Sequence, residues 1–513
     1  MSLATVYSRA QVAIHSVEVQ IEVHLANGLP AMNIIGLPET SVKESKDRVR
    51  SALSNCQFEF PARRITVSLA PADLPKQGSR YDVAIATALL AATGQLSPDT
   101  LGQYEILGEL SLSGEIRPVK SVLPAALSCK IADKTLILPE QNLAEALLVE
   151  GIKCIPVTHL LDVVNAISES REPVCSGSNE QASTIPDYQS LYSDLSDVRG
   201  QHMAKRGLTV AAAGSHNLLF IGPPGTGKTM LASRLPGLLP ELTNQEAIES
   251  ATVYSVSGNH DVASQWKKRP FRAPHHTASA VSLVGGGSQP RPGEVSLAHN
   301  GILFLDELPE FDRKVLEVLR EPLESGEICI SRATQQSQFP AKFQLVAAMN
   351  PCPCGHYGSS IHSCSCSAEQ VQRYRAKLSG PFLDRIDMHI EVAALPQGSL
   401  SVRQPVAEIT SSEIRERVEQ CRQRQLARQG KTNAQLSPAE LPKIMRISEN
   451  AEKMLEMAMT KFGISARAYH RILKLSLTIS DLAQCQEIEA KHMTEALGFR
   501  YFDRPVRPMA IGS

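Results

Sequence analysis

The segment GPPGTGKT (residues 222–229) constrains the fold of this chain more than any other stretch. It fits the pattern G-x-x-x-x-G-K-[ST], in which glycines let backbone N–H groups curl around a phosphate. The apolar run NLLFI before it predicts a buried strand, and the residues after it predict a helix whose positive end faces the anion. A simple glycine-rich turn is the alternative, but this context favours a nucleotide site. The loop comprises Gly222, Pro223, Pro224, Gly225, Thr226, Gly227, Lys228 and Thr229.

Two further apolar runs end in polar residues of the kind that such a site needs. GILFLDELPEF ends its run with Asp306 and Glu307, and FQLVAAMN ends with Asn350. The carboxyl ends of parallel strands meet at one edge of a sheet, so these side chains are expected beside the phosphate loop. The sequence therefore predicts an α/β core with a nucleoside triphosphate at that edge.

The chemistry expected there is hydrolysis of ATP or GTP. Lys228 is expected to bind the β- and γ-phosphates, and Thr229 and Asp306 to hold Mg²⁺. Glu307 is expected to polarise the attacking water. A "DE" pair after a strand is more often a solvated turn, and only the phosphate loop gives this pair its meaning.

The rest of the chain divides by its periodicity. The segment SVEVQIEVHL alternates strictly, as a half-buried strand does, and helical and strand patterns interleave after it. A stretch rich in Ser, Pro and Glu then predicts a linker. Strand patterns fade beyond Pro396, where long helical patterns follow. The expected domains are an α/β domain at 1–170, a linker at 171–196, an ATPase core at 197–395 with a cysteine-rich insertion at 350–367, and a helical lid at 396–513.

Composition limits the class of protein. The 513 residues are 42% hydrophobic and 20% charged, as in a globular protein, and no apolar run reaches the ~18 residues of a membrane helix. We expect a cytoplasmic protein that does not contact membranes. The formal net charge is −1, so nucleic acid would have to bind a local basic surface. The odd total of 11 cysteines argues against a disulfide framework.

These motifs together resemble those of an AAA+ ATPase. More narrowly, APHHTAS, GEVSLAHNGILFLDELPEF and AAMNPCPCG resemble the magnesium-chelatase-like YifB/ComM family, over nearly the whole chain. The resemblance implies an αβα phosphate-loop core, a C-terminal helical lid, ATP and Mg²⁺ as cofactors, and a homo-oligomeric ring, most often a hexamer. It also implies a DNA helicase that promotes branch migration during natural transformation, acting beside recombination proteins.

The same resemblance implies roles for polar residues outside the phosphate loop. Asn350 matches the polar sensor that positions the attacking water. Arg385 matches the arginine finger that reaches a neighbouring subunit's γ-phosphate, with a salt bridge to Asp384 or Asp387 as the alternative. Arg467 matches the lid arginine that senses nucleotide, and Arg471, one turn later, is the second candidate.

The N-terminal domain resembles a Lon protease, with its ribosomal S5 domain 2-like α+β fold, but lacks the catalytic pair. In PKQGSRYDVAIATALL, Arg80 stands at the position of the nucleophilic serine, and Leu123 stands at the position of the lysine base. Nucleophilic catalysis needs a hydroxyl and a base in reach, and neither residue supplies one. A shifted pair of Ser79 and Lys120 is the alternative. We expect no peptide cleavage.

The sequence constrains the substrate less than the ATPase. Basic residues before and after the Asp306 strand are candidates for contact with single-stranded or branched DNA, although solvated basic loops are an equally good reading. The alternative function is a protein-remodelling ATPase, such as a magnesium-chelatase-like motor or an unfoldase. A chelatase motor is expected to lack both the Lon-like domain and the cysteines. The DNA candidates are Lys267, Lys268, Arg269, Arg272, Arg332 and Lys342.

Four cysteines follow Asn350 in the pattern C-x-C-x₉-C-x-C. Four thiolates suit tetrahedral Zn²⁺, although the usual spacing within a pair is C-x₂₋₄-C. Four reduced thiols on a loop are the alternative. We expect a structural zinc site at Cys352, Cys354, Cys364 and Cys366.

Overall fold

The computed structural model describes residues 3–175, 191–258, 261–287, 290–331, 336–358, 362–394 and 408–500. Arg332 and most of the expected linker lie outside these ranges. The chain forms two compact units. Unit 1 contains Met1–Ile185, Asn244–Trp266 and Cys329–Phe339, and unit 2 contains Pro186–Thr243, Lys267–Ile328 and Pro340–Ser513.

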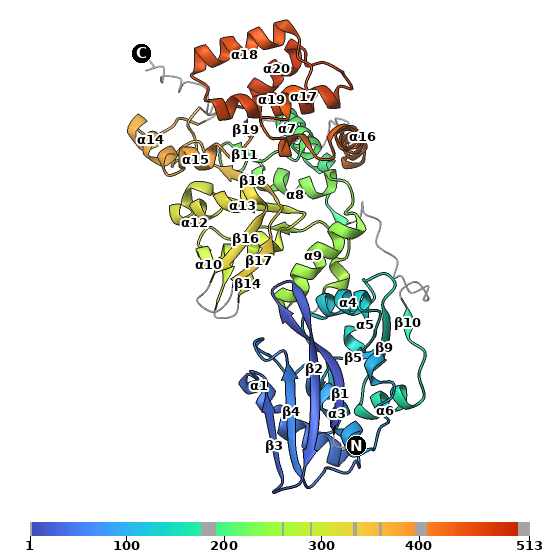
Figure 1. Cartoon of the computed structure of the whole chain (residues 1–513). Coiled ribbons are helices and arrows are strands. Elements are labelled where there is room, and N and C mark those ends of the chain that lie inside the picture. Colours follow the sequence, from blue (N-terminus) through green and yellow to red (C-terminus); the bar gives the residue numbers. More distant parts are fainter. Residues whose placement is uncertain are drawn as a thin grey trace. The chain divides into compact units, whose positions relative to one another are not determined.

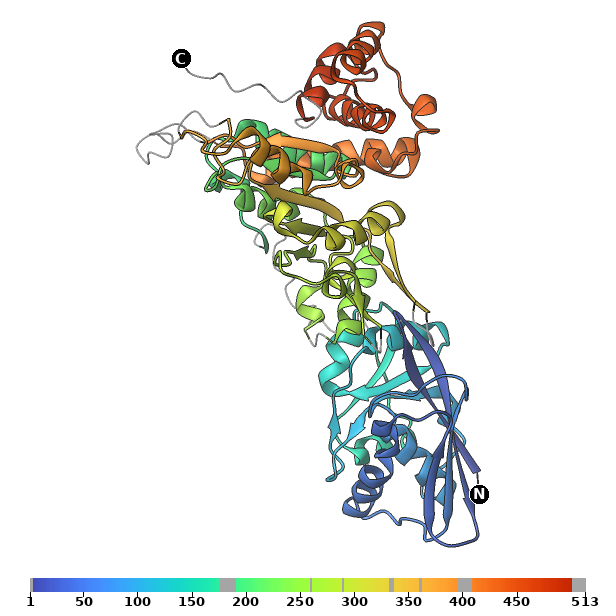
Figure 2. The same cartoon turned by 90° about the vertical axis from the view of Figure 1, so that its left-hand side faces the viewer.

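Unit 1 is built on a mixed eight-stranded sheet (Figure 1). Its long strands β1, β2 and β4 pair antiparallel, while β1, β5, β8 and β9 run parallel to one another. Figure 2 shows β1 and β2 side by side along their length. The strands, in sheet order, are β10 (Val174–Cys175), β9 (Lys153–Val157), β8 (Thr135–Pro139), β5 (Tyr104–Ile106), β1 (Leu3–Val12), β2 (His15–Ala26), β4 (Arg64–Ala70) and β3 (Ala31–Ile35).

The helices of unit 1 complete its core. Eleven of the twelve residues of α3 are buried, which explains why YDVAIATALLAA is apolar on every side. The small hairpin β6 (Glu109–Leu110) and β7 (Ile116–Arg117) lies outside the main sheet. The helices are α1 (Thr40–Lys43), α2 (Ser45–Asn55), α3 (Asp82–Thr93), α4 (Val122–Ile131), α5 (Leu143–Ala146) and α6 (Leu160–Ser168).

Unit 1 is not continuous in sequence. Helix α9 (Asn244–Ser257) falls within the range expected for the ATPase core, yet it packs against α4. Ala251 and Val262 share one apolar cluster with Leu123 and Val149. The Ser255 hydroxyl also donates a hydrogen bond of 2.5 Å to the buried Glu145 carboxylate.

Unit 2 contains a five-stranded sheet in the order β12-β15-β18-β11-β19, in which every pairing is parallel. The three apolar runs predicted as buried parallel strands are β11, β15 and β18, which confirms that prediction. The strands are β12 (Phe271–Arg272), β15 (Ile302–Leu305), β18 (Gln344–Met349), β11 (Leu218–Ile221) and β19 (Met388–Glu391).

Helices surround this sheet, and short hairpins extend from the segments between its strands. One hairpin pairs β16 (Glu327–Ser331) with β17 (Gln336–Pro340). A second hairpin pairs β13 (Gly285–Gly286) with β14 (Arg291–Pro292). The helices up to β19 are α7 (His202–Gly214), α8 (Lys228–Leu238), α10 (Ala280–Val284), α11 (Glu294–Leu297), α12 (Arg313–Val318), α13 (Arg320–Ser325), α14 (Ala368–Ala376) and α15 (Gly380–Leu383).

The described chain after residue 408 is helical and shares the core of unit 2. Val418, Leu475 and Met493 join Leu208 and Phe220 in one buried cluster. Among the described helices, none combines the length and apolar character that crossing a lipid bilayer requires. These C-terminal helices, red in Figure 1, are α16 (Ser411–Gln429), α17 (Leu441–Ile444), α18 (Glu449–Phe462), α19 (Ala466–Leu482) and α20 (Ala490–Gly498).

Candidate nucleotide site and cysteine cluster

The phosphate loop joins β11 to α8, as predicted. Gly227 precedes α8 with φ 84°, and Gly225 has φ 76°, both in the left-handed region that favours glycine. Gly222 is required for another reason, because a Cβ there would lie 2.2 Å from the Val392 carbonyl oxygen beyond β19. The Thr226 hydroxyl closes the loop with a 2.9 Å hydrogen bond to the Pro223 carbonyl.

Lys228 lies inside this loop. Its Nζ donates to the carbonyls of Gly222 at 2.7 Å and Pro223 at 2.8 Å, and to Asn350 Oδ1 at 3.2 Å. Burial lowers the pKa of Lys228, while the carboxylates of Asp306 and Glu307 act to raise it. The ammonium group is thus only weakly hydrated, and phosphate oxygens could replace the carbonyls as its acceptors.

The carboxyl edge of the sheet brings the expected magnesium ligands together. The Thr229 hydroxyl donates a 2.6 Å hydrogen bond to Asp306 Oδ2, which joins α8 to the end of β15. A hydroxyl and a carboxylate are hard oxygen donors of the kind that Mg²⁺ takes beside nucleotide phosphates. The two groups therefore fit the cation that was inferred from sequence.

Glu307 adopts an unusual conformation next to them. Its φ of 51° lies in the left-handed region, and its backbone N–H donates to Asp306 Oδ1 at 2.9 Å. Its carboxylate lies 3.2 Å from Nδ1 of His276. His276 belongs to the APHHTAS motif, so the motif marked the position but not its contact.

Arg385 is held within its own chain. It is buried and donates to the carbonyls of Arg320 at 3.2 Å and Pro381 at 2.6 Å. Its Nη2 also lies 2.5 Å from Glu324, a partner 61 residues earlier in the sequence than Arg385. The pairings with Asp384 and Asp387 that the sequence offered as alternatives are replaced by this one. A role at a neighbouring subunit's phosphate requires Arg385 to leave Glu324.

The two arginines of α19 that the sequence offered as nucleotide sensors have different surroundings. Arg467 is 67% exposed and lies 3.7 Å from Asp384, a loose pair. Arg471 forms a close ion pair with Asp387, a buried carboxylate that also lies 3.5 Å from His216 Nδ1. Burial acts to raise the pKa of Asp387, but the Arg471 guanidinium and His216 hold it well below its usual range. Arg467 is thus the arginine that remains available to a ligand.

The basic candidates for DNA contact also separate. Arg269 is buried and donates to the carbonyls of Pro240 at 2.7 Å and Asn300 at 2.8 Å, so the structure removes it from the candidates. Arg272 forms two hydrogen bonds with the Glu294 carboxylate, at 2.7 and 2.9 Å, which offsets its charge. Three lysines keep some exposure and stay candidates: Lys267, Lys268 and Lys342.

The positions examined for a protease pair lie in the core of unit 1. Arg80 is buried and donates to the carbonyl of Lys120, and Leu123 is fully buried. The Ser79 hydroxyl donates to the Glu109 carboxylate rather than to an amine. Neither the matched nor the shifted pair is brought together as a nucleophile and a lysine base among the described contacts.

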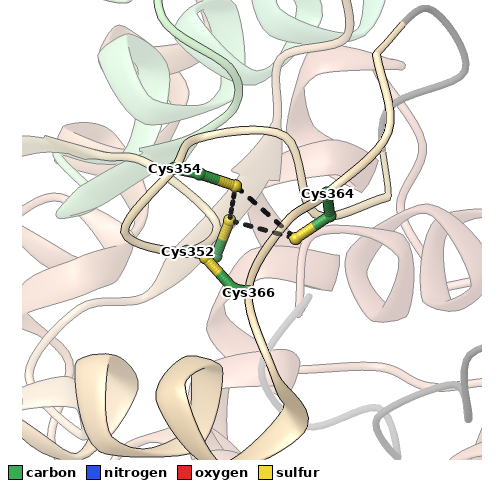
Figure 3. A group of neighbouring side chains, drawn as sticks. All are labelled: Cys352, Cys354, Cys364 and Cys366. Carbon is green, nitrogen blue, oxygen red and sulfur yellow. Dashed lines mark hydrogen bonds between the residues drawn. The ribbon is translucent and has the colours of Figure 1, made fainter.

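The four cysteines converge on one point (Figure 3). Their Sγ atoms all lie within 4.8 Å of one another. The separations are 3.4 Å for Cys352–Cys354, 3.7 Å for Cys352–Cys364 and 3.6 Å for Cys354–Cys364. A regular tetrahedron with Zn–S bonds of about 2.3 Å has S···S edges of about 3.8 Å. Together with Cys366, the donor set and its spacing fit Zn²⁺.

The charge on these thiols also favours a cation. The backbone N–H of His356 lowers the pKa of Cys354 to about 5, while burial raises the pKa of Cys364 to about 12. The neighbouring sulfurs of Cys354 and Cys352 add to the rise in the pKa of Cys364. A divalent cation would stabilise all four as thiolates.

Sequence comparisons place the chain among known proteins. It is 53% identical over 512 residues, 99% of this chain and 100% of the relative, to "Competence protein ComM" of Haemophilus influenzae. The chain belongs to the YifB/ComM family of magnesium-chelatase-like proteins. It is also 47% identical over 504 residues, 98% of each chain, to "Uncharacterized protein YifB" of Escherichia coli.

Family models give the same result by region. The family model described as "Magnesium chelatase, subunit ChlI" matches residues 194–400, and the model of the ChlI C-terminal region matches residues 408–500. "Subunit ChlI of Mg-chelatase" matches residues 21–142. The N-terminal unit therefore does not by itself separate this family from chelatases, contrary to expectation. The "Magnesium-chelatase 38 kDa subunit" of Rhodobacter capsulatus matches only 31% of this chain, at 29% identity.

This membership and the site agree on an AAA+-like ATPase. The parallel sheet positions the phosphate loop, Asp306, Glu307 and Asn350 at one edge, as the sequence predicted. Membership of this family also implies ATP and Mg²⁺ as cofactors and an oligomeric protein.

Proposed function

We propose that the chain is an ATP-driven DNA motor that promotes branch migration while incoming DNA is integrated during natural transformation. The observation that carries the proposal is the 53% identity to a protein named for competence, over the full length of both chains. Hydrolysis of ATP at the site described above would supply the free energy for such movement. We place the motor in the cytoplasm, acting beside recombination proteins.

ATP hydrolysis at this site divides among residues of one sheet edge. Backbone N–H groups of the loop and Lys228 bind the phosphates, and Thr229 with Asp306 would hold Mg²⁺. When bound there, Mg²⁺ would neutralise charge that develops on the phosphate oxygens. Glu307 orients and polarises water, once its carboxylate turns from His276 toward the γ-phosphate. Asn350, already 3.2 Å from Lys228 Nζ, fixes that water's position.

Assembly would complete the site. A neighbouring subunit's Arg385 is the proposed finger, and Arg467 reports nucleotide to the lid. Such a finger raises kcat by roughly 10³–10⁵ in related phosphoryl-transfer enzymes. We propose a hexameric ring, in which Arg385 exchanges Glu324 for the phosphate of the adjacent subunit. We propose that residues 396–513 form the lid and that the ATPase core lies within 197–395, apart from Asn244–Trp266 and Cys329–Phe339, which belong to unit 1.

The N-terminal domain is proposed as a Lon-like module without protease activity, used in assembly or DNA guidance. The buried Arg80 and Leu123 occupy the positions that catalysis would need. The candidates for DNA contact are Lys267, Lys268 and Lys342, with Arg272 in reserve and Arg332 outside the described residues. Four bound thiolates would hold zinc in a structural role.

The second candidate function is a protein-remodelling motor. It is favoured by the similarity to magnesium-chelatase subunits, whose names concern magnesium rather than DNA. A test compares ATPase rate with and without forked DNA, then follows branch migration on a synthetic Holliday junction. The DNA motor predicts stimulation and movement by the wild type and no movement by Glu307→Gln. If the chain neither binds DNA nor is stimulated by it at moderate salt, the result would support the remodelling motor instead.

A further inference from the structure

The turn that carries Cys352 and Cys354 packs against the phosphate loop. Gly355, the residue after Cys354, is buried and has φ 84°. A Cβ built there would lie 2.6 Å from Pro224 Cδ and 3.2 Å from Pro224 Cγ. The backbone of the cysteine turn therefore supports the ring of a phosphate-loop proline, with no space for a side chain between them.

The cluster is joined to the site a second time through β18. Asn350 stands two residues before Cys352, and its Oδ1 accepts a hydrogen bond of 3.2 Å from Lys228. The Gly222 N–H donates to the Met349 carbonyl at 3.2 Å. The first residue of the phosphate loop, Gly222, and its lysine, Lys228, are therefore both hydrogen-bonded to the segment that leads into the cysteine turn.

Besides the thiols, ring and backbone contacts hold the turn, such as the rings of His356 and His362, whose centroids lie 5.0 Å apart. Gly355 N–H donates to the Cys352 carbonyl at 3.0 Å, and Tyr357 N–H donates to Cys352 Sγ at 3.3 Å. The second arm ends at Cys366, and the next residue, Ser367, caps α14. A metal bound to all four sulfurs would tie the arm that supports Pro224 to the arm that starts α14. Part of the free energy of metal binding would then stabilise the local fold.

We propose that zinc on Cys352, Cys354, Cys364 and Cys366 positions the phosphate loop, so that nucleotide affinity depends on the metal through the Gly355–Pro224 contact. The proposal rests on the ATPase site and not on DNA. The cysteines act as positioning residues, because none of them touches the nucleotide site through its sulfur.

The test separates the metal from the contact with three variants of the full chain. Cys364→Ser removes a ligand and leaves the turn beside Pro224 unchanged. Gly355→Ala keeps all four ligands but inserts a methyl group where 2.6 Å is available. Gly358→Ala is the matched control, because Gly358 has a similar φ of 78° and nothing within 4 Å of its Cβ position. It imposes the same backbone strain without the clash.

Two quantities are measured on each variant without DNA: bound zinc per chain by elemental analysis, and the Kd of a fluorescent, non-hydrolysable ATP analogue. We expect Gly355→Ala to keep its zinc and to raise the Kd roughly tenfold, as moderate overpacking does. Cys364→Ser should lose zinc and raise the Kd to a similar extent. Gly358→Ala should change neither.

Three results would overturn the proposal. The first is a wild-type chain that is purified without zinc and binds the analogue as tightly as after zinc addition. The second is a folded, zinc-free Cys364→Ser protein with unchanged Kd. The third is an unchanged Kd in Gly355→Ala, which stays informative if Cys364→Ser does not fold. Loss of DNA stimulation alone would count against the DNA motor and would leave this proposal standing.

Discussion

Arg467 and Arg471 stand one turn apart on α19, and the same substitution should affect them in opposite ways. Arg471→Met removes the partner of the buried Asp387 and leaves an uncompensated charge, at a cost of about 3 kcal/mol or more. For a domain of roughly 150–250 residues, this corresponds to a fall in Tm of roughly 6–12 °C. Arg467→Met removes only a pair at 3.7 Å on an exposed side chain, which contributes about 0–1 kcal/mol.

The ATPase activity of the two variants should show the opposite order, with the larger loss in Arg467→Met. If Arg467 contacts nucleotide, Arg467→Met should lower kcat on the order of 10²-fold while Tm stays within about 4 °C of the wild type. Thermal melting and steady-state ATPase on the two purified proteins provide the test. Adding Asp387→Asn to Arg471→Met should recover part of the lost stability, since it removes the unpaired charge. An Arg471→Met protein that melts like the wild type but lacks ATPase activity would refute this assignment of roles.

Three further predictions follow from the same site. Lys228→Ala should abolish nucleotide binding and hydrolysis but leave the far-UV circular dichroism spectrum unchanged, because the loop's closing hydrogen bond at Thr226 is retained. Arg385→Ala should lower the steady-state ATPase rate by about 10³-fold or more. Glu324→Gln weakens the ion pair that holds Arg385, so it should preserve or raise that rate. Equal losses of ATPase rate in both variants would show that the pair is only structural. Acid should weaken unit 2 only at low pH: the pKa of Asp387 is depressed on folding, so its stabilising contribution is complete above the unfolded value of about 3.9 and is lost gradually as pH falls from there toward the lower folded pKa. Melting curves between about pH 5 and 2, compared with those of Asp387→Asn, can detect the loss.

Local patterns in the sequence predicted the phosphate-binding edge well. The strands before Gly222, Asp306 and Asn350 are short apolar runs with a polar residue at the end, and a parallel sheet has one edge at which such ends can meet. The convergence of the four cysteines was also predictable, because it follows from residue type and spacing.

The contacts that sequence missed join residues distant along the chain. The partner of Arg385 is Glu324, although Asp384 and Asp387 stand closer in sequence. Arg269 is the type of residue that contacts DNA, but its guanidinium donates hydrogen bonds to backbone carbonyls that lie near it only in the folded chain. No periodicity or motif encodes such pairings.

The discontinuity of unit 1 has a consequence for how the protein is made. A chain that emerges from the ribosome N-terminus first exposes β1 to α6 long before α9, so the surface around Leu123 and Val149 stays uncovered in the interval. The phosphate loop is synthesised within that interval. The N-terminal unit thus reaches its final packing only after part of the ATPase has been translated, and a fragment that stops at residue 185 would keep an apolar face that the full chain covers with Ala251 and Val262.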